Sequence, residues 1–107
     1  MVERLDEVFH ALAHTARRDM LSRLEHGTLT ISELSAPLTM SFAAASKHVQ
    51  VLERAGLVRR TVSGRTHVCR LETEPLRDAT AWLRFYERHW TQRLDALDAV
   101  LREDEAT

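Results

Sequence analysis

The chain has 107 residues, a formal net charge of −1 and a single cysteine. This length predicts one domain, which spans residues 1–107 and buries about 60–70% of its unfolded surface. One thiol excludes an internal disulfide and a four-thiolate zinc site within a single chain. No apolar run reaches the roughly 18 residues of a membrane helix, and the charged start does not fit a signal peptide. We therefore expect a cytoplasmic protein.

The small net charge hides a strong asymmetry along the chain. Residues 41–70 carry six Lys and Arg side chains against one carboxylate, whereas the segments before and after them are both acidic. Basic charge concentrated on one part of a chain is typical of a nucleic-acid-binding surface. The middle of the sequence is therefore where we expect the binding site.

Three helices are predicted before that segment. Apolar side chains at helical spacing indicate a first helix over residues 4–12 and a second over residues 15–25. Thr30 and Glu33 fit a capping box, in which each side chain accepts a free backbone N–H of the other residue, so a short third helix begins here. Pro37 ends this helix, because the residue before a proline avoids the helical conformation.

The helix predicted within residues 40–58 is the one around which the chain is organised. Its buried stripe, at i, i+4 and i+7, consists of Ala45, Val49 and Leu52. Ser41 precedes it as an N-cap, and Gly56 can adopt the left-handed conformation that closes a helix.

The opposite face of this helix is small, polar and basic. It carries Phe42, Ala43, Ser46, Lys47 and Gln50. Small side chains allow close approach, amides and hydroxyls can read base edges, and a lysine can meet a phosphate. This face suits the floor of a DNA major groove, although an ordinary amphipathic helix is the alternative. Two short helices joined by a tight turn, the second one basic, form the helix-turn-helix pattern.

A β-hairpin is predicted directly after this helix. Residues 57–62 and 67–71 are rich in β-branched and apolar side chains, and Gly64 lies in the four-residue link between them. Arg65 at the tip makes the hairpin a wing that can touch the minor groove or phosphates, and we expect Arg60 to meet phosphate as well. The residues expected to contact DNA are Ser41, Phe42, Ala43, Ser46, Lys47, His48, Gln50, Arg59 and Arg65.

Residues 74–102 predict a long final helix of about 43 Å. Four of the six aromatic residues of the chain lie in it, and it has more apolar surface than one small domain can cover. We therefore expect a homodimer in which this helix packs against its copy, with help from the first helix. The expected interface residues are Leu5, Phe9, Leu83, Tyr86, Trp90, Leu94 and Leu97. The expected fold is thus mainly α with a small β-hairpin, a winged helix-turn-helix with about five helices and a two-stranded wing.

One run of residues, SKHVQVLERAGLV from Ser46 to Val58, is quite specific. Together with FHALAHTARRDMLSRL before it, this run resembles the ArsR/SmtB (arsenic-repressor) family of winged helix-turn-helix transcription repressors. The resemblance extends from Phe9 to Leu71. It implies a homodimer that binds a palindromic operator in double-stranded DNA and blocks transcription, often of its own gene.

The chain departs from the family pattern in two places. Where the family has Ala-Asp-Pro-Thr-Arg-Arg, this chain lacks the proline, and Thr15 is expected to cap the second helix instead. Metal-sensing members carry a Glu-Leu-Cys-x-Cys run, whereas residues 33–37 here contain no cysteine. The resemblance is therefore to a subgroup without the cysteine metal-sensing motif. We expect no cofactor, and an unidentified small-molecule inducer stays open.

Several alternatives remain at this stage. Asp6, His10 and His14 lie four residues apart, a spacing at which helical side chains can share a metal, so a metal-responsive repressor that uses His sites is one alternative. A winged-helix protein-interaction module is another, with the aromatic helix docking a partner. Arg17 and Arg18 could meet phosphate or form surface ion pairs. Nothing resembles an enzyme, because the sequence shows no nucleophile triad, phosphate loop or paired carboxylates.

Overall fold

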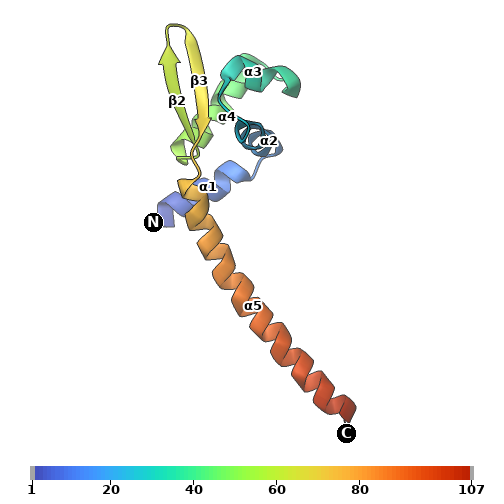
Figure 1. The fold of residues 1–107 in the computed structure, drawn as a ribbon. Coiled ribbons are helices and arrows are strands. Elements are labelled where there is room, and N and C mark those ends of the chain that lie inside the picture. The colour runs from blue at the N-terminus through green and yellow to red at the C-terminus, as the bar shows by residue number, and fades with distance from the viewer. Residues whose placement is uncertain (1, 107) are drawn as a thin grey trace.

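The computed structural model of the protein describes residues 2–106, and side chains for residues 4–105. Met1 and Thr107, the two ends of the predicted domain, lie outside the described residues. The elements in chain order are α1 (Val2–Leu12), α2 (Thr15–Leu24), β1 (Leu29–Thr30), α3 (Ile31–Ser35), the 3-10 helix η1 (Ala36–Leu38), α4 (Phe42–Arg54), β2 (Val58–Ser63), β3 (Thr66–Leu71) and α5 (Glu74–Ala106) (Figure 1).

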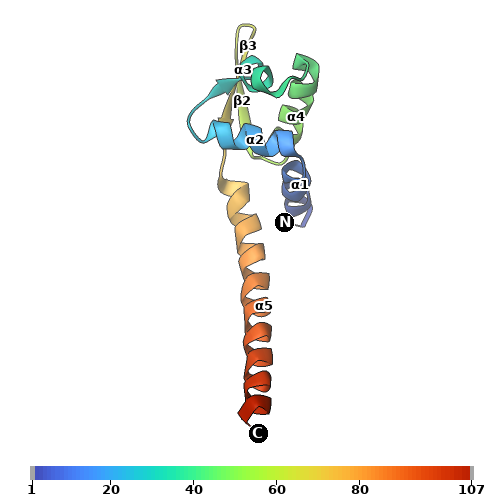
Figure 2. The same ribbon diagram turned by 90° about the vertical axis from the view of Figure 1, so that its right-hand side faces the viewer.

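The molecule consists of a compact body and one long projecting helix. Helices α1 to α4 and the sheet form the body, and α5 starts beside α1 and runs away from it (Figures 1 and 2). The principal extents of 74 × 30 × 21 Å reflect this projection. Only the first turns of α5 are anchored, through the buried side chains of Pro75 and Ala79.

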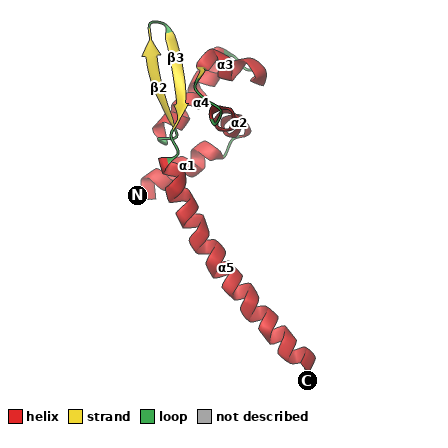
Figure 3. Cartoon of the chain, viewed as in Figure 1, coloured by secondary structure: helices red, strands yellow, loops and turns green. Residues whose placement is uncertain are grey.

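The wing is confirmed, and the sheet contains one strand more than the predicted two (Figure 3). Strands β2 and β3 form the antiparallel hairpin, with Ser63 opposite Thr66 and Gly64 at a φ of 63° in the turn. Strand β1 adds to the other edge of β3, where Leu29 lies opposite Cys69. A two-residue strand has no alternation of side chains from which a sequence could predict it.

The helix ends follow the predicted caps with one exception. The reciprocal bonds of the Thr30–Glu33 capping box are both 3.1 Å long. Ser41 Oγ accepts the backbone N–H of Ala44 at 3.1 Å. The prediction for Thr15 is wrong, because His14 is the N-cap of α2 and its Nδ1 accepts the backbone N–H of Ala16 at 3.1 Å. An acceptor nitrogen on His14 thus replaces the hydroxyl that we expected from the next residue.

The core lies where the helices of the body meet the sheet. The predicted stripe of α4 is fully buried in it, which fixes the opposite face of α4 outward. The large side chains at its centre are Val8, Met20, Ile31, Leu34, Val49, Leu52 and Leu57. Leu5 and Phe9 are only partly buried at its edge, and the Phe9 ring packs edge-on against Trp82 of α5 at 5.5 Å between centroids.

Arg17 of α2 is buried and joins three helices. Its Nε donates to the carbonyl oxygen of Ala11 at 2.8 Å, and its Nη2 donates to that of His10 at 2.9 Å. Its Nη1 lies 3.2 Å from Nδ1 of His48 on α4. The partial negative charge at the C-terminus of α1 stabilises the buried guanidinium. Arg18 likewise donates to the carbonyl oxygen of Leu12, at 2.7 Å. Both arginines therefore bind the carbonyl end of α1. The sequence had left open a phosphate contact or a surface ion pair for them, and neither is the contact seen here.

The bond from Arg17 defines the protonation state of His48. A guanidinium can only donate, so Nδ1 of His48 accepts, and the imidazole is neutral. The ring of His14 lies 4.4 Å from the ring of His48, between centroids. Burial lowers the pKa of His48, and the neighbouring His14 and Arg17 side chains lower it further. The contact between α2 and α4 thus depends on an uncharged histidine.

We predict that the protein loses stability when His48 is forced to take up a proton. In the unfolded chain a histidine has a pKa of about 6.5, and in the folded state that of His48 is lower. Its contribution to the unfolding free energy is therefore complete above about pH 6.5 and is lost as the pH falls through the lowered folded-state pKa. His48→Gln keeps an oxygen that can accept from Arg17 but does not titrate. It should flatten the pH dependence of urea unfolding on the acid side of neutrality.

His26→Gln is the matched control, because His26 is an exposed histidine in the turn after α2. This variant should keep the pH dependence of the wild type. If His48→Gln and the wild type lose the same unfolding free energy on acidification, protonation of His48 does not cause that loss.

Candidate nucleic-acid interface

The outward face of α4 presents the residue types predicted from the sequence. Five of these side chains are exposed, namely Ser41, Phe42, Ala43, Lys47 and Gln50. Ser46 and His48 are half-buried at its borders. The face is therefore accessible to a partner between Ser41 and Gln50, and its small residues leave the helix backbone close to the surface.

The start of α4 and the tip of the wing border the same hollow, which has a volume of about 240 Å³. Its lining comes from three segments, residues 30–32, residues 65–67 and Phe42. The wing tip and the start of α4 are thus next to each other, although Phe42 and Arg65 are far apart in the sequence. A ligand lying along α4 reaches the wing as well.

The basic side chains of this region fall into two groups. Lys47 and Arg65 are exposed. Arg59 is 68% exposed and its Nε lies 3.6 Å from Oε1 of Glu72. Arg70 Nη2 lies 3.0 Å from the same oxygen. A single surface carboxylate near two arginines leaves both guanidiniums accessible, since exposed ion pairs are weak.

Arg60 belongs to the structure rather than to the accessible surface. Its side chain is only 14% exposed, and both Nε and Nη2 donate to Oε1 of Glu53 near the end of α4. Its Nη1 lies 3.2 Å from Nδ1 of His67 on β3. Arg60 therefore ties α4 to the wing, which leaves its guanidinium little exposed surface for the phosphate contact expected from the sequence. The clue in the sequence is Glu53, the only carboxylate of residues 41–70.

His48 also has a structural role that the sequence did not indicate, because its side chain contacts Arg17 of α2. Because its Nδ1 is engaged with Arg17, the other ring nitrogen, Nε2, is the one left for an outside partner. His48 thus lies between the interior contacts of α4 and its outward face.

The remaining candidate sites of the sequence do not assemble in the structure. Within residues 2–106, no three His, Cys, Asp or Glu side chains come together in a metal-binding arrangement. His14 already uses Nδ1 as a cap. Cys69 is fully buried on β3, and burial raises the pKa of its thiol, which keeps it protonated. In the same part of the chain no helix combines the length and apolarity needed to cross a membrane.

Helix α5 presents a second extended surface, and it is apolar. Beyond residue 80 every described side chain of the helix is exposed. The large apolar ones are Trp82, Leu83, Phe85, Tyr86, Trp90, Leu94, Leu97, Val100 and Leu101. All the α5 residues expected at a dimer interface are in this set. A face of this extent is typical of a protein–protein contact.

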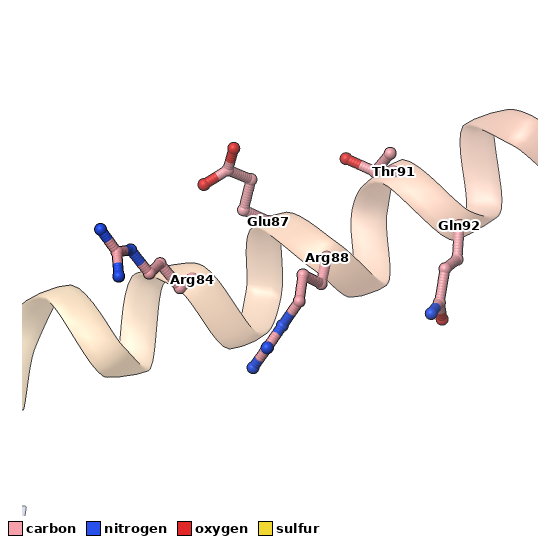
Figure 4. A pocket seen from close by; sticks show the side chains of 5 residues that line it. All are labelled: Arg84, Glu87, Arg88, Thr91 and Gln92. Atoms are coloured by element: carbon pink, nitrogen blue, oxygen red, sulfur yellow. The ribbon is translucent and has the colours of Figure 1, made fainter.

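The polar side of α5 contains a shallow hollow of about 400 Å³. Its lining residues are Arg84, Glu87, Arg88, Thr91 and Gln92 (Figure 4). All five lie on the one helix, and their side chains point outward to either side of it (Figure 4). With no second element to enclose it, this hollow is a groove of the helix surface and offers no ligand site in a single chain.

Comparison with known proteins identifies the kind of protein to which this arrangement belongs. A helix-turn-helix domain model matches residues 12–61, which include α2, α3 and α4. The HTH-type transcriptional regulator Rv2034 of Mycobacterium tuberculosis is 36% identical over 89 residues, covering 83% of this chain and 80% of that protein. These matches are to transcriptional regulators and not to enzymes.

Solved structures extend the similarity to the whole fold. The crystal structure of the ArsR family transcriptional regulator RHA00566 has a TM-score of 0.81 and 37% identity, covering 85% of this chain and 94% of that one. The homodimeric winged helix-turn-helix DNA-binding domain of Mb0332 from Mycobacterium bovis shares the fold, with a TM-score of 0.65, 22% identity and 85% coverage of each chain. On its sequence and its fold, this chain belongs to the ArsR family of winged helix-turn-helix transcriptional regulators.

Proposed function

We propose that this protein is a transcriptional repressor that binds a palindromic operator as a homodimer, and that the DNA upstream of its own gene contains one such operator. The observation that carries the proposal is the exposed reading face of α4 beside a basic-tipped wing. A repressor of this kind acts by occupying DNA that the transcription machinery needs. It works where the DNA is, so we infer a cytoplasmic location.

The geometry supports different roles for different exposed side chains, some reading bases and others contacting phosphates. Helix α4 enters the major groove, where Gln50 and Ser46 read base edges. Lys47 and Arg65 neutralise phosphates, with Arg59 as a further basic contact on the wing. The contact of His48 with Arg17 ties α4 to α2, and the contact of Glu53 with Arg60 ties α4 to the wing. Reading helix and wing therefore meet the duplex as one rigid unit.

A dimer is needed because one reading helix covers only half of a palindrome. Two copies of α4 have to meet successive major grooves on one face of the DNA, about 34 Å apart. The apolar face of α5 supports a second copy of the chain as its partner, since a lone chain leaves nine large hydrophobic side chains of the described part of α5 exposed. The M. bovis domain that shares this fold is homodimeric. We propose α5 as the dimerisation helix, with Leu5 and Phe9 at its edge.

We predict a strong salt dependence of DNA binding. A dimer presents Lys47 and Arg65 twice, and log affinity should fall with log salt at a slope of about −0.9 for each phosphate neutralised. Lys47→Ala should weaken binding to all duplexes and reduce the slope by about 1 for each contact that is lost. Fluorescence anisotropy with the DNA upstream of the gene, over a series of salt concentrations, measures both effects.

Gln50→Ala is the matched control on the same face. It should leave the salt slope unchanged and cost about 1–3 kcal/mol on the operator, with a much smaller loss on random DNA. A wild-type slope of log affinity against log salt near zero would contradict the DNA-binding proposal. Equal losses on operator and random DNA would reduce Gln50 to a positioning contact.

We predict that Leu94→Glu abolishes the dimer. Leu94 lies in the apolar face of α5 and is 47% exposed in the single chain. In the dimer its replacement would bury an unpaired charge. Sedimentation should show a monomer, and operator affinity should fall toward the non-specific level. Asp95→Ala, next to it on the polar side of α5, should stay dimeric. A Leu94→Glu protein that remains dimeric and binds operator normally would show that the interface lies elsewhere.

We also predict that soft metals do not release the protein from DNA. Cys69 is the only thiol, and it is buried, so arsenite, cadmium and zinc lack an accessible thiolate. Operator binding measured with and without low micromolar metal should be the same. Release by any of these metals, abolished in Cys69→Ser or His10→Ala, would instead support the metal-responsive alternative.

A further inference from the structure

Phe42 is the one large apolar side chain on the reading face. It is the first residue of α4, directly after the Ser41 cap, and 54% of it is exposed. The larger apolar residues that follow on α4, Val49, Val51 and Leu52, either belong to the core or are partly buried against it. Phe42 thus contributes little to the hydrophobic core, and its ring is free to contact a partner.

The surroundings of Phe42 are polar on the side of the wing. It borders the hollow whose other lining residues are Thr30, Ile31, Ser32, Arg65, Thr66 and His67. Ala43, beside it, and Ser46, one turn later, are both small. A base edge can therefore approach the start of α4 closely, with the Phe42 ring as its apolar contact.

Major-groove chemistry offers one apolar group to such a ring. The N-terminal residues of a reading helix contact base edges. Among the groups exposed in the major groove, only the C5-methyl of thymine is apolar, and phenylalanine is one of the side chains that contacts it. We propose that Phe42 determines part of the operator specificity by reading the C5-methyl group of a pyrimidine, with thymine as its source. This inference rests on the proposed DNA-binding function.

The experiment removes the methyl group without changing base pairing. The wild-type protein is used to select a duplex from a random-sequence pool, and this duplex is then prepared with thymine or with uracil at every thymine position. The wild type should bind the uracil duplex about fourfold more weakly for each methyl contacted, the effect of losing one buried CH₂-sized group. Phe42→Ala should bind both duplexes with the same affinity, close to that of the wild type on uracil DNA.

Two further variants test whether the ring itself reads the methyl. Phe42→Leu keeps an apolar side chain and should retain part of the preference for thymine. Val62→Ala is the matched control, because Val62 is a 56% exposed apolar residue on the wing. This variant should keep the full preference for thymine over uracil. The methyl group lies in the major groove, which we expect α4 and not the wing to enter. Urea unfolding of each variant confirms that the fold is intact.

A second arm identifies the source of the methyl group. A thymine position that matters in the first arm is replaced by cytosine or by 5-methylcytosine, and only the latter carries a methyl at the same place. Higher affinity for the methylated duplex in the wild type, but not in Phe42→Ala, supports methyl reading irrespective of the base.

The outcomes separate this inference from the function on which it rests. Equal wild-type affinity for thymine and uracil duplexes overturns methyl reading but leaves the DNA-binding proposal intact. So does a Phe42→Ala protein that keeps the wild-type preference, because another residue then reads the methyl. Failure of the wild type to select any duplex overturns the proposed function itself.

Discussion

The arrangement of the body depends on one buried cation. Arg17 starts on α2, satisfies the last carbonyls of α1 and reaches His48 on the reading helix. Burying a guanidinium is costly unless every N–H finds an acceptor, and here the end of a helix supplies both the acceptors and the compensating partial charge. Because α1 also packs against α5, this contact connects the proposed dimerisation helix to the proposed DNA-reading helix through a chain of direct contacts.

A second arginine holds the other end of α4. Arg60 binds Glu53 near the end of α4 and approaches His67 on the wing. Helix α4 is thus fixed at two points by side chains that leave its outward face unoccupied. The basic segment, which looked uniform in the sequence, therefore has two functions. Arg60 fixes α4, whereas the other five cations, Lys47, Arg54, Arg59, Arg65 and Arg70, are exposed and accessible to a polyanion.

The sequence predicted most of the local structure correctly, because local structure here follows from short-range rules. The capping box of Thr30 and Glu33, the Ser41 cap and the hairpin around Gly64 all depend on residues within a few positions of one another. The exception is instructive. Replacement of the family's proline segment led us to expect a hydroxyl cap from Thr15, whereas His14 caps α2 with an imidazole nitrogen. That ring is also in contact with His48, a contact that only the fold creates.

What the sequence determined by itself was the pattern, namely which faces of the helices are apolar, where basic charge gathers, and a run of residues specific enough to indicate the family. What only the tertiary structure decided was the partner of each charged side chain. Arg17, Arg18 and Arg60 could not be told from DNA contacts by their spacing, because their acceptors lie six or seven residues away or, for His48, on another helix. Strand β1 likewise exists because β3 offers it a free edge. Its two residues are too few to show the alternation from which a strand can be predicted. Side-chain partnership and edge pairing depend on distances in space, which the order of residues along the chain does not contain.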